Sequence, residues 1–215
     1  MEPVQEGEIE YRIATKEDVD VIAYQMASDF FRREPVVSKV EGIVLPDDVL
    51  PFTTMAGKVI LNEELSLKAI HVPTGKAIGF RNAYSITEDS DPMKEAIKDN
   101  WPSLHPMVQA LLQMLEMEEK CAPQLLKRNN LKRVIQCFGL LVLEEYEGRG
   151  IGTRKSGFEG AKATAANPRS RRIFEKEGFE NVGHYFPSQV MTEDGSKLMP
   201  SLPEDTKVIV YLKKF

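Results

Sequence analysis

The sequence has few of the residues that build disulfide frameworks or metal centres. Its 215 residues include two cysteines, Cys121 and Cys137, and three histidines. Two cysteines permit one disulfide at most, and we expect both to be reduced thiols. The histidines His71, His105 and His184 are scattered without ligand-like spacing. No metal site is therefore predicted.

Strong charge and long apolar runs are also lacking. The formal net charge is −5, whereas a nucleic-acid surface would need a basic stripe, so no nucleic-acid partner is predicted. No apolar stretch approaches the roughly 20 residues of a membrane span, and residues 1–10 are polar and acidic. We therefore predict a cytoplasmic protein without a membrane contact.

The composition favours a globular domain. Hydrophobic residues make up 42% of the chain and charged residues 28%, which is enough apolar material for a core and excludes disorder. Neither an internal repeat nor a long linker divides the sequence. We predict one domain over residues 1–215, and a monomer.

The periodicity of the apolar residues predicts a chain that mixes strands and helices. Alternation over Glu8–Ala14 indicates a strand, and Thr15 then begins a helix that Pro35 stops. Two alternating runs around Pro73-Thr74-Gly75 predict a β-hairpin. The other predicted helices are 47–61, 106–120 and 167–178, and the other strands are 131–143, 161–165, 182–186 and 207–212.

A glycine-rich segment follows the apolar run Leu131–Leu143. Gly148, Gly150 and Gly152 allow positive φ angles or a close approach of the backbone to a ligand. Successive N–H groups in such a turn can bind an anion, although a plain tight turn is an equally good interpretation. Position 155 is Lys where a dinucleotide fingerprint has its third glycine, so that assignment fails.

Several segments together resemble one family. Tyr146–Thr153 resembles the acetyl-CoA loop of the GNAT acyltransferases, usually written Arg/Gln-x-x-Gly-x-Gly/Ala, and Asn167–Phe179 resembles the segment that follows it. Phe30–Pro35 is similar to the Phe-Phe-x-x-Glu-Pro signature of the invertebrate arylalkylamine N-acetyltransferases, and Tyr185–Phe215 to their C-terminal hairpin. The resemblance covers nearly the whole chain in the right order.

The resemblance implies an α/β (α+β) GNAT fold, in which helices flank a central, mixed, twisted sheet of six to seven strands. It also implies transfer of an acetyl group from acetyl-CoA, the cosubstrate, to the primary amine of a small arylalkylamine or alkylamine. Glu34 would be the general base, because an alkylamine is protonated near neutral pH and must lose a proton before it attacks. Burial beside Phe30 and Phe31 would raise the pKa of Glu34 toward neutrality. By its residues alone, Glu34 is more simply a surface acid at a helix end before proline, and the resemblance is what favours the catalytic role.

The resemblance also implies the remaining site residues. Ser170 or water would protonate the departing thiolate, although Ser170 could be an ordinary helix serine. Phe30, Phe31 and Tyr185 would line the amine pocket, and for Tyr185 a core position is the alternative. The implied acetyl-CoA contacts are Leu141, Val142, Gly148, Arg149, Gly150, Ile151, Gly152, Thr153 and Asn167.

The chain departs from the family pattern in three places. Glu147 stands where Arg or Gln is usual, which should weaken phosphate binding, and Phe174 replaces a tyrosine often found as the general acid. Four residues, 153–156, separate Gly152 from Gly157, so the helix after the glycine loop is largely missing. An acyl-CoA-binding form without activity is therefore an alternative, as is an enzyme for polyamines or peptide amines.

Overall fold

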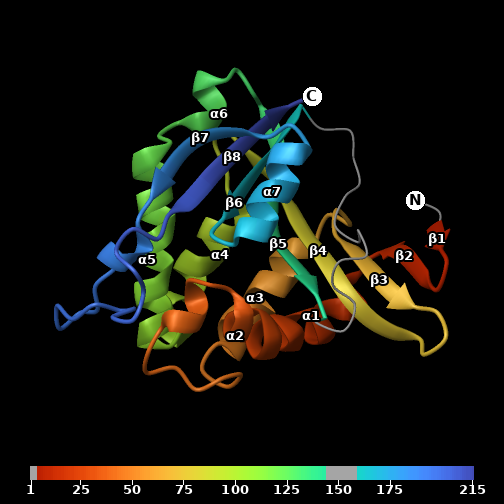
Figure 1. Cartoon of the computed structure of the whole chain (residues 1–215), viewed down its shortest axis with the longest axis horizontal. Helices are drawn as coiled ribbons and strands as arrows, with labels where there is room; N and C mark the ends of the chain where they lie inside the picture. The colour runs from red at the N-terminus through yellow and green to blue at the C-terminus, as the bar shows by residue number, and fades with distance from the viewer. Residues whose placement is uncertain (1–3, 144–158) are drawn as a thin grey trace.

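The computed structural model, which describes residues 4–143 and 159–215, is built around one mixed sheet (Figure 1). Its strand order is β1-β2-β3-β4-β5-β6-β8-β7. The three-residue edge strand β1 brings the sheet to eight strands, against the six to seven predicted. The strands are β1 (Val4–Glu6), β2 (Ile9–Ile13), β3 (Leu67–His71), β4 (Lys76–Thr87), β5 (Arg133–Val142), β6 (Gly160–Ala165), β7 (Glu180–Tyr185) and β8 (Val208–Lys214).

Helices cover both faces of this sheet, as predicted. They are α1 (Val19–Gln25), α2 (Phe31–Arg33), α3 (Leu50–Ile60), α4 (Pro92–Asn100), α5 (Pro106–Cys121), α6 (Leu125–Arg128) and α7 (Pro168–Lys176). A π-helical turn over Met26–Phe30 joins α1 to α2 within the first predicted helix. Helix α4 was not predicted, although the side chain of Asp91 caps its first turn and Pro92 begins it.

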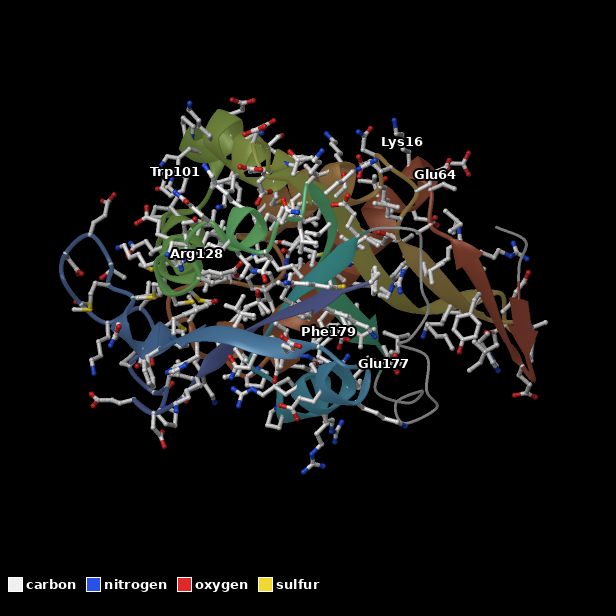
Figure 2. The ribbon with its side chains drawn as sticks, turned by 90° about the horizontal axis from the view of Figure 1, so that it is seen from above. Lys16, Glu64, Trp101, Arg128, Glu177 and Phe179 are labelled. Carbon is white, nitrogen blue, oxygen red and sulfur yellow. The ribbon has the colours of Figure 1, made fainter. Side chains whose placement is uncertain are left out.

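Alternating side chains of the strands divide the core into two layers. On β8, Val208, Val210 and Leu212 join the large core beneath helices α1, α3, α4 and α5. Ile209 and Tyr211 point the other way, into a smaller cluster with Phe174 of α7. Figure 2 shows Glu177 and Phe179, at the end of α7, on the opposite side of the sheet from Trp101.

The central strands β5 and β6 are the one parallel pair among the described strands, and they separate early. Their pairing runs from Ile135 opposite Ala161 to Cys137 opposite Ala163. Beyond it, residues 139–142 of β5 pair with β4 alone among the described residues. Phe138 is the extra residue of a bulge at this point, since Asn82 pairs with Gly139 and Ala83 with Cys137. The sheet therefore opens in its middle.

Helix α5 lies close against β7 because β7 has a glycine at the contact. A Cβ atom on Gly183 would lie 3.1 Å from the carbonyl oxygen of Cys121, tighter than nearly all real contacts. This approach brings the last turns of α5, which carry Glu118, near the strand that carries Tyr185.

Candidate active site

Glu34 lies at the end of the first helical segment. Its backbone leaves the helical region, with ψ 129°, and Pro35 follows, which disfavours further helix at this position. The carboxylate turns back onto the next residues: Oε2 accepts hydrogen bonds from the N–H groups of Val36 (2.7 Å) and Val37 (2.8 Å). The backbone N–H groups of Val36 and Val37, and not a cationic side chain, thus hold the carboxylate in place.

Burial sets the electrostatics of Glu34. Loss of water raises the pKa of this carboxyl, and the hydrogen bonds from Val37 and Val36 lower it by less, so the pKa of Glu34 lies above its ordinary value. Both N–H groups donate to Oε2, which leaves Oε1 as the oxygen available to a ligand. A carboxylate with a raised pKa holds a proton more strongly than an ordinary one, which suits a general base.

A cleft of about 660 Å³ lies where β5 and β6 separate. Its walls are the edge of β5 that pairs with none of the described strands, the end of β6 and helix α7. Leu143 donates its N–H to Ile78 of β4, so in the alternating pattern of an antiparallel ladder Leu140 and Val142 turn their backbone groups toward the cleft. The guanidinium of Arg33 donates to the Val142 carbonyl at 2.8 Å and connects α2 to this edge.

A second, more apolar cavity of about 220 Å³ lies on the face of the sheet covered by α4 and α5. Aromatic and aliphatic side chains dominate its lining, among them Phe31, Phe52 and Leu111. Phe30, Glu34 and Phe138 line both the cleft and this cavity. We call the two spaces the donor cleft and the acceptor cavity.

The structure brings most of the predicted site residues to these two spaces. Phe31 and Tyr185 line the acceptor cavity, whereas Val142, Asn167 and Ser170 line the donor cleft. Phe30, Glu34 and Leu141 line both. The oxygen of the Asn167 side chain accepts the N–H of Arg169 at 2.9 Å and so caps α7. Gly148, Arg149, Gly150, Ile151, Gly152 and Thr153 lie outside the described residues, as do Glu147 and the predicted shortened helix.

The position that lacks a tyrosine is filled by aromatic packing. Phe174 stacks against Phe179 and Tyr211, with ring centroids 5.1 and 5.7 Å apart. The Tyr211 hydroxyl donates to Glu175 at 2.9 Å, and the ring belongs to the core cluster beneath α7. Burial, followed by the hydrogen bond to Glu175, raises the pKa of Tyr211 to about 12. Ser170 is therefore the hydroxyl that faces the donor cleft from α7.

Sequence reasoning missed the polar residues of the acceptor cavity. Glu118 of α5 pairs with Lys162 of β6 and accepts a hydrogen bond from the Thr164 hydroxyl at 2.8 Å. Burial raises the pKa of Tyr84, and the charges of Asp91 and Glu118 add to that rise. The available signal was a lysine and a threonine that alternate with alanines in a short buried strand.

The described residues contain no group of three or more His, Cys, Asp or Glu side chains that could hold a metal ion. Likewise, none of the helices in the described part of the chain is long and apolar enough to cross a membrane.

Comparison with known proteins connects this fold to a class of enzymes. No family model and no curated protein matches the sequence. Among solved structures, mosquito arylalkylamine N-acetyltransferase like 5b is similar, with a TM-score of 0.78 and 18% identity over 96% of this chain and 100% of that one. Arylalkylamine N-acetyltransferase 2 from Aedes aegypti is also similar, with a TM-score of 0.76 and 16% identity over 97% of this chain and 99% of that one.

A polyamine N-acetyltransferase from Drosophila melanogaster matches equally well, with a TM-score of 0.76 and 13% identity over 96% of this chain and 100% of that one. The chain therefore has the fold of the GNAT acetyltransferases, and the predicted fold class is confirmed.

Proposed function

We propose that this protein is an acetyl-CoA-dependent N-acetyltransferase that acts on the primary amine of a small arylalkylamine or alkylamine. One observation carries the proposal: Glu34, a partly buried carboxylate without a cation among its hydrogen-bond donors, lies at the junction of the donor cleft and the acceptor cavity. The resemblance of Phe30–Pro35 to the arylalkylamine signature and the fold of the similar enzymes support it.

The donor cleft suits the acyl carrier. Pantetheine has amide groups that can pair with a strand edge, and the backbone of Leu140 and the N–H of Val142 present such an edge beside the Val142 carbonyl that Arg33 already occupies. Leu141 would contribute through its side chain, because its backbone faces β4. We also propose that residues 148–153 bind the pyrophosphate through their backbone N–H groups.

The reaction follows from the position of Glu34. Oε1 removes a proton from the bound ammonium, and the amine nitrogen then attacks the thioester carbonyl. A new C–N bond forms as the C–S bond breaks, and the nitrogen loses its second proton to water. The thiolate takes a proton from water or from Ser170, and the proton released by the nitrogen replaces it. Phe30 and Phe31 exclude water near Glu34, which keeps its pKa high enough for this transfer.

Replacing the proposed base tests this function directly. The Glu34→Gln variant keeps a carbonyl oxygen for the Val36 and Val37 N–H groups but cannot take a proton. We expect kcat/KM for tyramine to fall by roughly 10²–10⁴-fold, measured as thiol release from acetyl-CoA. Glu41→Gln is the matched control, since Glu41 is exposed and lines neither space. Full activity of Glu34→Gln would contradict the assigned base.

The substitution at Glu147 and the short segment after Gly152 favour a second candidate, an acyl-CoA-binding protein without turnover. Calorimetric titration with acetyl-CoA, beside the activity assay on a broad amine panel, separates the two. Binding without any turnover would support the second candidate, whereas turnover would exclude it.

A further inference from the structure

Three hollows lie in a row through the molecule, and the acceptor cavity is the middle one. At one end it shares Phe30 and Glu34 with the donor cleft. At its far end it meets a charged hollow of about 400 Å³ between α4, α5 and β6. The residues shared at the far end are Asp91, Lys94, Glu118 and Lys162. A substrate that places its amine at Glu34 therefore directs its opposite end toward polar groups.

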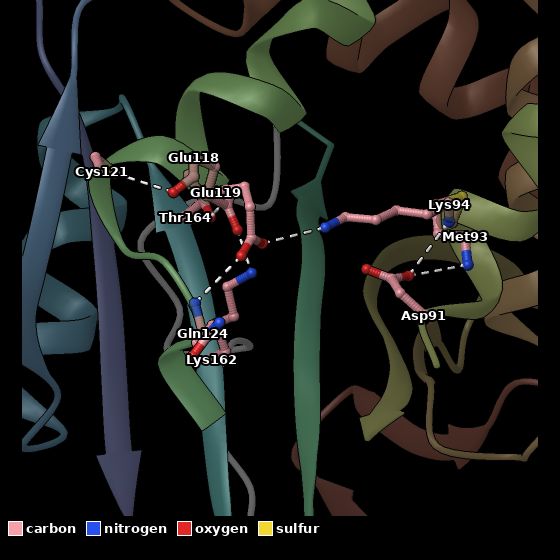
Figure 3. Close-up of polar contacts among 9 residues, drawn as sticks. All are labelled: Asp91, Met93, Lys94, Glu118, Glu119, Cys121, Gln124, Lys162 and Thr164. Carbon is pink, nitrogen blue, oxygen red and sulfur yellow. Dashed lines mark hydrogen bonds and ion pairs between the residues drawn. The ribbon is translucent and has the colours of Figure 1, made fainter. Parts of the chain in front are cut away.

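The two carboxylates at the far end, Asp91 and Glu118, already have partners (Figure 3). The carboxylate of Glu118 pairs with Lys162 and Thr164, and the side chain of Asp91 accepts the N–H groups of Met93 (3.0 Å) and Lys94 (3.3 Å). The shared residues comprise two carboxylates and two ammonium groups. A second cation on the substrate would have to compete with these partners, and it would lose its own water on entering.

An unsatisfied acceptor lies at the same place. Gln136 of β5 lines the acceptor cavity and stands between Tyr84 and Lys162 in a row across β4, β5 and β6. The residue is 8% exposed, and its amide oxygen has no hydrogen-bond partner within residues 4–143 and 159–215. Its amide nitrogen makes one long bond of 3.4 Å to the Cys137 carbonyl.

A buried acceptor without a partner is unfavourable, and native proteins rarely keep one without a reason. The last torsion of a glutamine side chain is soft, so the amide can turn its oxygen toward a donor that enters the cavity. Of the groups at this end, Gln136 is the acceptor that such a donor would satisfy.

We propose that the far end of the acceptor cavity recognises a neutral hydrogen-bond donor on the amine substrate, such as a phenolic hydroxyl, with Gln136 as its acceptor. The inference rests on the proposed function and adds a preference to it. It predicts selection for hydroxylated arylalkylamines over their unsubstituted parents and over diamines.

Three amines test the preference with the unaltered protein: 2-phenylethylamine, tyramine and 1,4-diaminobutane. We expect kcat/KM for tyramine to exceed that for 2-phenylethylamine by roughly tenfold, the effect of one buried hydrogen bond. The diamine should be the poorest of the three. Equal rates for tyramine and 2-phenylethylamine, or preference for the diamine, would overturn the inference.

The variant Gln136→Met tests the assigned acceptor, because methionine has a similar shape without the amide. The ratio of kcat/KM for tyramine to that for 2-phenylethylamine should fall to about one. Gln113→Met is the matched control: Gln113 lies on the outer side of α5, donates to the Met191 carbonyl and lines none of the three hollows. It should retain the preference.

The possible failures are distinct. If none of the amines is acetylated, the proposed function fails and the preference with it. If amines are acetylated and the tyramine preference survives in Gln136→Met, the function stands and Gln136 is not the acceptor.

Discussion

Glu34 is a carboxylate whose surroundings oppose its ionisation more than they favour it. Burial raises its pKa, and the Val36 and Val37 N–H groups offset that rise in part. An unfolded chain would give the same carboxyl its ordinary pKa of about 4.3. Folding therefore shifts Glu34 toward its protonated form relative to the unfolded chain, which has consequences for both activity and stability.

The sign of the stability effect follows from proton binding. Between the unfolded and the folded pKa of Glu34, the folded state binds more protons, so the free energy of unfolding falls as pH rises through this window. Glu34→Gln removes the titration and keeps the acceptor oxygen. We expect the Tm of the variant to rise relative to wild type as pH increases through the window, and thermal scans from pH 4 to 8 measure it. A Tm difference that stays constant with pH would contradict a raised pKa at Glu34.

Individual site residues differ in how far the sequence could predict them. Phe30, Phe31 and Glu34 lie in one hexapeptide whose resemblance to a known signature pointed to them together. Glu118 and Thr164 are 46 residues apart, and they meet because α5 packs across β6. No local pattern records such a contact, since it depends on how the two elements pack.

The strands and helices with a regular pattern of apolar residues were predicted from the sequence. Helix α4, whose pattern is weak, and the separation of β5 from β6 were not. The hairpin of β3 and β4 agrees with its alternating runs, and Gly75 adopts the positive φ of 65° that its turn needs. Helix α4 escaped prediction because nine residues with few apolar positions give a weak period, although Asp91 and Pro92 form an ordinary helix start. The early separation of β5 from β6 is a property of the pair that neither strand sequence reveals alone.

The contact between α5 and β7 can be tested through Gly183. An added Cβ would meet the Cys121 carbonyl at 3.1 Å and its Sγ at 3.2 Å, so the helix must shift. We expect Gly183→Ala to lower the free energy of unfolding by about 1–3 kcal/mol, measured by urea denaturation. The shift should also raise KM for the amine, because α5 lines the acceptor cavity.

Gly57→Ala is the control for this substitution. Gly57 lies within α3, and its added Cβ would make ordinary contacts of 3.6 Å with Val19. Alanine favours a helix interior by up to about 1 kcal/mol over glycine, so this variant should be as stable as wild type or more so. Equal free energies of unfolding for Gly183→Ala and Gly57→Ala would show that the close approach of α5 to β7 does not contribute to stability.

At the scale of the whole molecule, the two proposed substrates meet through a gap in the sheet. The donor cleft is bounded by α7 on one face, and the acceptor cavity lies under α4 and α5 on the other. Phe138 and Glu34 border both spaces where β5 has left β6. The fold thereby gives two spaces on opposite faces of the sheet one carboxylate in common.

The buried pair of Glu118 and Lys162 connects the helical layer to the sheet beside this gap. Their side chains are 12% and 14% exposed, so removal of one partner leaves the other charge with little water. We expect Lys162→Met to lower the free energy of unfolding by about 3–5 kcal/mol. Adding Glu118→Gln should recover most of the loss, because a neutral amide can still accept the Thr164 hydroxyl. Urea denaturation of the single and double variants gives the coupling energy, and additive losses would show that the pair does not join the two layers.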